Sequence, residues 1–235
     1  MRIITVKDYD TMSAAAAKII AEQVRTKPTS VLGFATGSSP VGTYKQLVKM
    51  YKAKKLDFSQ VTTFNLDEYC GLPKKHNQSY YYFMMENFFN HVNVPKGNIF
   101  LPNGVAADFK KECEAYEKKI AGKGGIDLQL LGVGANGHIG FNEPDSVFHN
   151  KTMQVNLTDS TIKANARFFE SMNDVPKTAL SMGIGTIMAA KKIVLVAGAE
   201  KAKAIKELEK PIVSPQNPVS ILHYHPDCTI IFVKE

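Results

Sequence analysis

Short apolar runs alternate along the chain with longer segments whose apolar residues recur every three to four positions. The runs predict β-strands at Arg2–Val6, Val31–Ala35, Val61–Leu66, Ile99–Leu101, Asp127–Val133, Thr152–Leu157, Lys192–Ala197 and Thr229–Val233. The periodic segments predict helices at Tyr9–Arg25, Pro40–Lys54, Ser79–Asn90, Asp108–Ala121, Asn165–Phe169, Gly185–Ala190, Lys201–Leu208 and Val219–Leu222. Apolar strands between helices are typical of a parallel sheet that is covered on both faces.

The length of 235 residues suits one large α/β domain with a sizeable core. No internal repeat, low-complexity segment or linker divides the chain, so we expect a single domain over residues 1–235. In such a fold, loops at the carboxyl ends of the parallel strands form the usual ligand crevice.

Composition and charge narrow the class of protein. No apolar run approaches the length of a membrane span, and the first residues lack the apolar core of a signal peptide. The three cysteines are widely spaced and predict neither a disulfide framework nor a metal site, which favours the cytoplasm. The net charge is +7, but the lysines are scattered beside glutamates on helix-like segments. We therefore expect a basic solvated surface, which is compatible with an anionic small molecule, rather than a nucleic-acid or membrane partner.

The segment from Leu130 to Pro144 carries the densest chemistry. It runs from an apolar strand into a glycine-rich loop that presents Asn136, His138 and Glu143 close together. A histidine beside a carboxylate can move protons near neutral pH. The same loop fits the dinucleotide pattern G-x-G-x-x-G, but no amphipathic helix follows the third glycine and no acidic residue ends the next strand. The segment therefore predicts a site for a small polar substrate.

Two further strand ends carry groups suited to a phosphate. Thr36-Gly37-Ser38-Ser39 lies just before the predicted helix at Pro40, where free N–H groups and hydroxyls attract anions, although a plain helix cap explains it equally well. Lys201 opens a predicted helix, where a cation is unfavourable unless an anion intervenes. Arg167 is a second candidate clamp, or else an ordinary surface arginine.

Asp67 and Glu68 follow the predicted strand Val61–Leu66 directly. Adjacent carboxylates at this edge of a sheet suit a general base with a neighbour. They equally suit a cap for the following turn, because aspartate is a common turn residue.

The chain resembles the glucosamine-6-phosphate deaminases over essentially its whole length. The resemblance rests on five segments: Thr36-Gly37-Ser38-Ser39-Pro40, Phe64-Asn65-Leu66-Asp67-Glu68-Tyr69 with Gly71-Leu72-Pro73, Gly132 through Pro144, Asn165-Ala166-Arg167-Phe168-Phe169, and Ala179-Leu180-Ser181-Met182-Gly183-Ile184-Gly185-Thr186. It implies a three-layer α/β/α sandwich with a modified Rossmann-like, mainly parallel sheet that binds no dinucleotide.

The resemblance also implies a reaction: D-glucosamine 6-phosphate and water give D-fructose 6-phosphate and ammonia, with no metal or organic cofactor. Asp67 corresponds to the base that moves a proton between C2 and C1. His138 corresponds to the group that opens the sugar ring, supported by Asn136 and Glu143. The substrate-binding set corresponds to Thr36, Gly37, Ser38, Ser39, Gly137, Arg167 and Lys201.

The chain departs from the longer, allosteric members of that family. Position 136 is asparagine where those members have aspartate, so this residue can orient the histidine but adds no charge. Met153 and Val155 occupy the positions that bind an activating sugar phosphate in those members, and the chain ends at Glu235 without their C-terminal extension. The resemblance therefore implies a non-allosteric enzyme, and a monomer is compatible with it.

Two other functions remain open at this point. A 6-phosphogluconolactonase of the same fold would share the phosphate-binding segments but would not need Asp67 in this setting. A sugar-phosphate-sensing domain would need none of the three groups Asp67, His138 and Glu143, and such sensors normally follow a DNA-binding helix-turn-helix.

Overall fold

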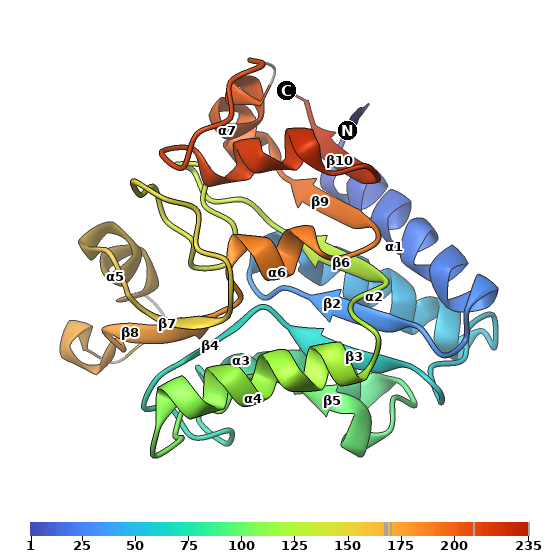
Figure 1. Ribbon diagram of the computed structural model, residues 1–235. Helices are drawn as coiled ribbons and strands as arrows, with labels where there is room; N and C mark the ends of the chain where they lie inside the picture. The colour runs from blue at the N-terminus through green and yellow to red at the C-terminus, as the bar shows by residue number, and fades with distance from the viewer. Residues whose placement is uncertain (167–168, 170, 209, 235) are drawn as a thin grey trace.

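The computed structural model describes residues 1–166, 169, 171–208 and 210–234 (Figure 1). Its strands are β1 Arg2–Val6, β2 Val31–Phe34, β3 Thr62–Asn65, β4 Asp67–Tyr69, β5 Ile99–Phe100, β6 Leu128–Leu131, β7 Met153–Asn156, β8 Thr178–Ser181, β9 Ile193–Ala197 and β10 Cys228–Val233. Its α-helices are α1 Tyr9–Thr26, α2 Ser38–Lys52, α3 Tyr80–Asn87, α4 Phe109–Gly122, α5 Asp159–Ala166, α6 Ile184–Met188 and α7 Ala202–Glu207.

Seven strands form the main sheet in the order β1-β10-β9-β6-β2-β3-β5, and all neighbouring pairs are parallel. The mainly parallel sheet of the prediction is thus confirmed. Because the strands run the same way, the segments that follow β2, β3, β6 and β9 all emerge at one edge of the sheet, the carboxyl edge.

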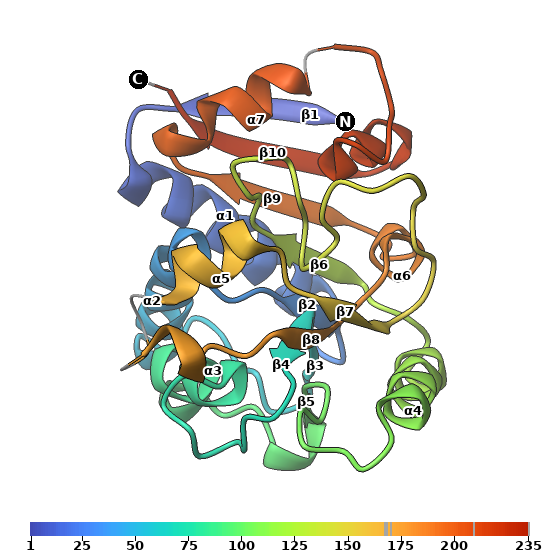
Figure 2. The same ribbon diagram turned by 90° about the vertical axis from the view of Figure 1, so that its left-hand side faces the viewer.

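The buried strands separate two apolar cores. Within β9, Val194 and Val196 pack against α1, α2 and α3, whereas Ile193, Leu195 and Ala197 pack against α4, α6 and α7. Successive side chains of a strand point to opposite faces, so one continuous apolar run can serve both cores. Figure 2 shows α1 and α2 on one side of the sheet and α4 and α6 on the other, which confirms the three-layer α/β/α sandwich.

A second, antiparallel sheet lies beside the carboxyl edge of the main sheet and carries α5 (Figure 1). Its order is β4-β8-β7, with Asp67 of β4 opposite Ser181 of β8. The sequence analysis did not predict β4 or β8. It predicted the β7 segment as a strand but did not place it in a second sheet. Three-residue β4 is too short for a periodicity signal, and Asp67 and Glu68 resemble turn residues.

Several predicted boundaries were wrong. The helix expected at Asn165–Phe169 is α5, which begins at Asp159, where the Thr158 hydroxyl accepts a hydrogen bond from the Thr161 amide. That hydroxyl acts as a cap that the prediction overlooked. The helix expected from Pro40 begins at Ser38, and the one expected at Val219–Leu222 is a 3₁₀ helix, Pro218–Tyr224. Among the described residues, no helix is long and apolar enough to cross a membrane.

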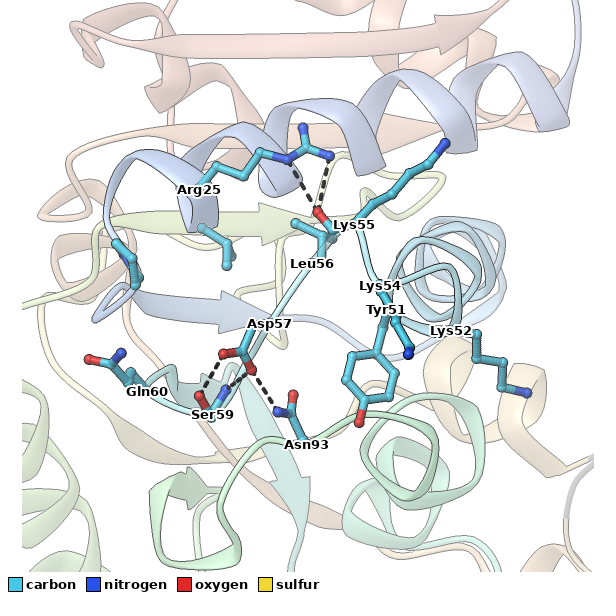
Figure 3. Close-up of a pocket in the computed structure, with 12 residues that line it drawn as sticks. Arg25, Tyr51, Lys52, Lys54, Lys55, Leu56, Asp57, Ser59, Gln60 and Asn93 are labelled. Atoms are coloured by element: carbon cyan, nitrogen blue, oxygen red, sulfur yellow. Dashed lines mark hydrogen bonds between the residues drawn. The ribbon is translucent and has the colours of Figure 1, made fainter.

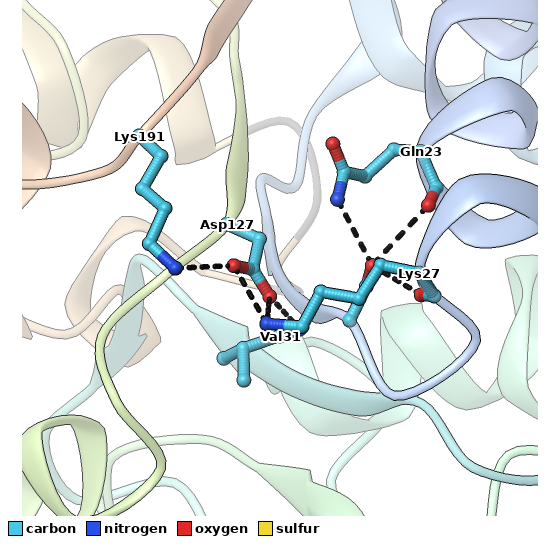
Figure 4. A network of polar contacts seen from close by, with 6 residues as sticks. Gln23, Lys27, Val31, Asp127 and Lys191 are labelled. Carbon is cyan, nitrogen blue, oxygen red and sulfur yellow. Dashed lines mark hydrogen bonds and ion pairs between the residues drawn. The ribbon is translucent and has the colours of Figure 1, made fainter.

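Asp127 ties the opposite, amino edge of the sheet together (Figure 4). Its carboxylate is 4% exposed and accepts hydrogen bonds from the Val31 amide at 2.8 Å and from the ammonium groups of Lys27 and Lys191. Burial by itself would raise the pKa of Asp127, but the lysines and the Val31 amide outweigh it and lower that pKa below 3.8. The cluster joins the start of β2, the start of β6 and the turn before β9.

Replacing Asp127 with alanine should lower the free energy of unfolding by about 1–3 kcal/mol, because the buried Val31 amide loses its acceptor. Asp127→Asn should destabilise less at neutral pH. A lowered pKa stabilises the fold above the unfolded value and ceases to do so as the pH falls through the folded one. The deficit of Asp127→Asn should therefore shrink below about pH 3.8. Urea unfolding at several pH values measures this loss of stability, and Asp10→Asn, at an exposed position, is the control. A loss that does not change with pH would contradict a role for the Asp127 charge.

Candidate active site

A cleft of about 230 Å³ opens at the carboxyl edge of the main sheet. It is lined by residues that follow β2, β3 and β6, together with the first residues of α3 and α5: Ala35, Thr36, Gly37, Leu66, Asp67, Tyr80, Gly132, Gly134, His138, Gly140, Phe141 and Thr161. The sequence analysis therefore placed the site at the correct edge. The geometry brings Thr36, Gly37, Asp67 and His138 to one cleft.

A larger cavity lies elsewhere, where α1 and α2 end and β3 begins (Figure 3). It measures about 790 Å³ and has several basic residues on its rim. Its carboxylate, Asp57, already accepts hydrogen bonds from Ser59 and Asn93, and the side chains of Lys52 and Lys55 point away from its centre in Figure 3. The small cleft holds the groups suited to proton transfer, so we assign the chemistry there.

Asp67 is a buried residue that lines the cleft. It is 6% exposed, and its Oδ1 atom has no hydrogen-bond partner among the described residues. Burial, and then the charge of neighbouring Glu68, raises the pKa of Asp67 to about 8. A carboxyl group whose pKa lies this close to neutrality can both take up and return a proton.

The loop after β6 needs glycine at two points. A side chain at Gly134 would overlap the imidazole of His138, which lies 2.2 Å from the position of a Cβ atom there. Gly140 has a φ of +58°, and a Cβ atom there would lie 3.1 Å from the Ser181 hydroxyl and 3.7 Å from Asp67 Oδ2. Close approach and left-handed backbone both favour glycine. The loop thereby places His138 in the cleft that Asp67 also lines.

His138, Asn136 and Glu143 form a connected group. The Asn136 amide nitrogen donates to Glu143 Oε2 at 2.7 Å, so its carbonyl oxygen accepts from His138 Nδ1 at 2.8 Å. Glu143 Oε2 also lies 3.3 Å from His138 Nδ1. With a proton fixed on Nδ1, the Nε2 atom of His138 is left to exchange protons with a ligand.

Glu143 is held as a carboxylate. Its Oε1 atom accepts a hydrogen bond from the Thr161 hydroxyl at 2.7 Å. Partial burial raises the pKa of Glu143, but hydrogen bonds from His138, Thr161 and Asn136 and the charge of His138 outweigh it and lower that pKa to about 2. The histidine therefore has a permanent negative charge beside it.

The phosphate-binding candidates lie at the same edge. Gly37 is the residue before α2, and no side chain caps the N–H groups of that helix, to which Ser38 and Ser39 belong. Thr36 and Gly37 line the cleft, and the Gly137 carbonyl accepts a hydrogen bond from the Val219 amide.

The two predicted clamps are less directly placed. Lys201 ends the 3₁₀ helix Ala199–Lys201 that follows β9, and it is not among the residues that line the cleft. Arg167 lies outside the described residues.

Tyr80, Phe141 and Thr161 are among the cleft residues that the sequence analysis did not predict as site residues. The rings of Tyr80 and Phe141 stack 6.0 Å apart at an interplanar angle of 6°. Tyr80 lies in the helix that the apolar periodicity predicts at Ser79–Asn90, and the pattern does not place it in the cleft. The caps Ser79 and Thr158, which begin α3 and α5, were the available signals that these helices start at the cleft.

Met153 and Val155 lie on β7. Together with Glu143, Pro144 and His149 they line a further cavity of about 210 Å³. Lys151, the basic residue nearest to them in sequence, pairs with Glu117 at 3.5 Å. The absence of an activator site stays a prediction. Within the described part of the chain, no group of three His, Cys, Asp or Glu residues could hold a metal ion.

Comparison with known proteins gives a consistent result. The family model for "Glucosamine-6-phosphate isomerases/6-phosphogluconolactonase" matches residues 7–231. A glucosamine-6-phosphate deaminase of Thermoanaerobacter pseudethanolicus is 55% identical over 236 aligned positions, covering 100% of this chain and 93% of the relative. One from Alkaliphilus oremlandii is 57% identical, covering 97% of this chain and 95% of the relative.

Solved structures separate the two branches of that family. A monomeric glucosamine-6-phosphate deaminase superposes with a TM-score of 0.97 at 43% identity, over 100% of this chain and 98% of the other. The 6-phosphogluconolactonase of Thermotoga maritima shares the fold, with a TM-score of 0.74 at 19% identity over 100% of this chain and 99% of the other. The chain belongs to the family of glucosamine-6-phosphate isomerases and 6-phosphogluconolactonases.

Proposed function

We propose that this protein is a glucosamine-6-phosphate deaminase that converts D-glucosamine 6-phosphate and water to D-fructose 6-phosphate and ammonia. The observation that carries the proposal is the pairing, across one small cleft, of a buried carboxyl group on Asp67 with the His138–Asn136–Glu143 group. The names of the full-length relatives support the same reaction.

His138 opens the sugar ring in this proposal. Ring opening requires a proton on the ring oxygen O5 and loss of a proton from O1, and an imidazole Nε2 atom can perform both transfers. Asn136 fixes the proton on Nδ1, and the Glu143 carboxylate stabilises the imidazolium form. The neutral amide thus supplies orientation while Glu143 supplies the charge.

Asp67 then carries a proton between two carbon atoms of the open chain. As a carboxylate it removes the proton from C2 while the substrate's ammonium group gives a proton to the carbonyl oxygen O1, which forms an enolamine. Asp67 then returns its proton to C1, which gives the protonated 2-imine. Water adds to C2 of the imine, and ammonia leaves. The substrate's own nitrogen stabilises the intermediate, and one carboxyl group with a pKa near 8 serves both transfers.

The phosphate group binds, in this proposal, at the start of α2. Thr36 and Gly37 line the cleft, and the N–H groups of the first turn of α2 follow them directly. The hydroxyls of Ser38 and Ser39 and the cation of Lys201, which do not line the cleft itself, complete the proposed anion site. Gly137 and Arg167 are retained as substrate-binding residues from the family resemblance. A lactonase would have no amine to release, so ammonia production from glucosamine 6-phosphate separates the two branches of the family.

Asp67→Asn should lower kcat by roughly 10²–10⁴-fold, because the amide cannot accept the proton from C2. The variant should also unfold at a higher temperature than the wild type at pH 9, and less so at pH 6. A raised folded pKa stabilises the fold at low pH, and that contribution is lost as the pH rises through about 8. Coupled ammonia assays and thermal unfolding measure both effects. Near-normal turnover by the folded variant would refute the role of Asp67.

His138→Gln should lose about 10²–10⁴-fold with the cyclic substrate, because glutamine cannot exchange a proton at the position of Nε2. An acyclic analogue that cannot form the ring should bypass this step and lose much less. Single-turnover rates with both substrates make the comparison, and exposed His149→Gln is the matched control. Equal losses for the two substrates would assign His138 to a later step.

Lys201→Ala should weaken binding of glucosamine 6-phosphate by roughly 10- to 150-fold, the loss of one charge-assisted hydrogen bond worth about 1.5–3 kcal/mol. Affinity for unphosphorylated glucosamine should not change. Lys203→Ala, an exposed lysine two residues away, is the control. Titration calorimetry with both sugars measures the difference, and parallel losses for the two sugars would argue against a phosphate contact.

A further inference from the structure

Glu68 is the buried carboxylate beside Asp67 for which the reaction proposed above provides no task. It is 3% exposed and lies on β4. Successive residues of a strand point to opposite faces. Accordingly, Asp67 lines the cleft, while the Glu68 carboxylate contacts the first turn of α3.

Glu68 completes the start of α3. Its Oε1 atom accepts hydrogen bonds from the amides of Tyr69 at 2.9 Å and Tyr80 at 2.8 Å, and its Oε2 atom accepts from the Tyr81 amide at 2.9 Å. The Ser79 hydroxyl accepts from the Tyr82 amide. The first N–H groups of a helix have no partners within the helix, and here a carboxylate from another element satisfies two of them.

This contact fixes a wall of the cleft. Tyr80 is the first residue of α3 and lines the cleft, where its ring stacks on Phe141 and lies 4.7 Å from the ring of Tyr69. On the other side of Glu68, a Cβ atom at Gly104 would lie 3.3 Å from Glu68 Cγ. Glu68 is therefore confined between a loop and a helix, and it cannot move away from Asp67.

We propose that Glu68 is a positioning residue for the reaction, which holds the Tyr80 wall by clamping α3 to β4 and places a fixed second carboxylate behind Asp67. The inference rests on the proposed function, because it assigns Glu68 to the base of that reaction. Glu68 does not touch the substrate. It acts through the charge state of Asp67 and through the position of Tyr80.

The charged neighbours agree with this assignment. Burial raises the pKa of Glu68 to about 7, although the three amides and the Lys74 cation lower it. Asp67 is surrounded by Tyr44, Tyr80 and Tyr116, whose pKa values are raised by burial and which stay neutral in the working range. Of these titratable groups around Asp67, Glu68 is the one that becomes charged as the pH rises through about 7, and its charge raises the pKa of Asp67. His138 lines the same cleft as Asp67.

The test measures the protonation of Asp67 directly. Carbon-13 NMR of protein labelled at the aspartate carboxyl carbons gives the titration midpoint, and Asp67→Asn assigns the resonance. Glu68→Gln should lower the midpoint of Asp67 by at least about 1 pH unit, because the like charge is gone. The acid limb of kcat/KM should shift to lower pH with it. Glu86→Gln, the same change at an exposed position of α3, should shift neither.

A second variant separates the clamp from the charge. Glu68→Asp keeps the negative charge but is one methylene shorter, so it cannot reach both Tyr80 and Tyr81. The Asp67 midpoint should stay near its wild-type value, while KM rises and the amides of Tyr80 and Tyr81 exchange hydrogen faster. This variant also decides the matter if Glu68→Gln does not fold.

Each outcome has a definite meaning. An unchanged midpoint in Glu68→Gln, or unchanged exchange and KM in Glu68→Asp, would overturn the positioning role. A shifted midpoint in a protein that releases no ammonia from glucosamine 6-phosphate would retain the coupling between the two carboxyl groups and refute the proposed function instead.

Discussion

The site depends on one unfavourable arrangement, the burial of Asp67 with no cation beside it among the residues that the structure describes. Removing a carboxylate from water is strongly unfavourable, and the group responds by holding its proton to a higher pH. A cation such as lysine beside Asp67 would lower its pKa and make it a weak base. The surrounding groups are instead aromatic residues, glycine and a second carboxylate, so the basicity of Asp67 follows directly from what is packed around it.

The second proton-transfer group is built by the opposite principle. His138 lines the cleft, and its imidazole is held by Asn136. Asn136 is held in turn by Glu143, and Glu143 by the Thr161 hydroxyl. The Asn136 amide is held at both ends, since it donates to Glu143 and accepts from His138. An aspartate at position 136 would place two carboxylates within hydrogen-bonding distance of each other and would need a shared proton. The asparagine leaves a single defined charge beside the histidine.

Those features that repeat along the chain were predictable from the sequence. Apolar strands such as Ile193–Ala197 serve both cores, and their carboxyl ends locate the cleft. The β4-β8-β7 sheet was not predictable, because β4 has three residues and its pairing with Ser181 spans more than a hundred positions. Of the residues predicted for catalysis, Asp67, Asn136, His138 and Glu143 come together. The Ser79 cap marks where α3 begins, but the sequence could not place Tyr80 in the wall of the cleft, because tertiary contacts with Glu68 and Phe141 hold it there.

Asp127 and Asp67 lie near opposite edges of the parallel sheet, and their pKa values are shifted in opposite directions. Asp127 lies at the amino edge, where two lysines and the Val31 amide lower its pKa and its charge joins three segments. Asp67 lies at the carboxyl edge, where the described residues offer it no lysine and leave its Oδ1 atom without a hydrogen-bond partner, and its pKa moves in the opposite direction. Both are almost fully buried, so burial alone does not decide the outcome. The difference lies in the partners, and the proposed reaction, in which the cleft binds an anionic sugar and exchanges protons with it, requires the unpaired form at the edge where the loops converge.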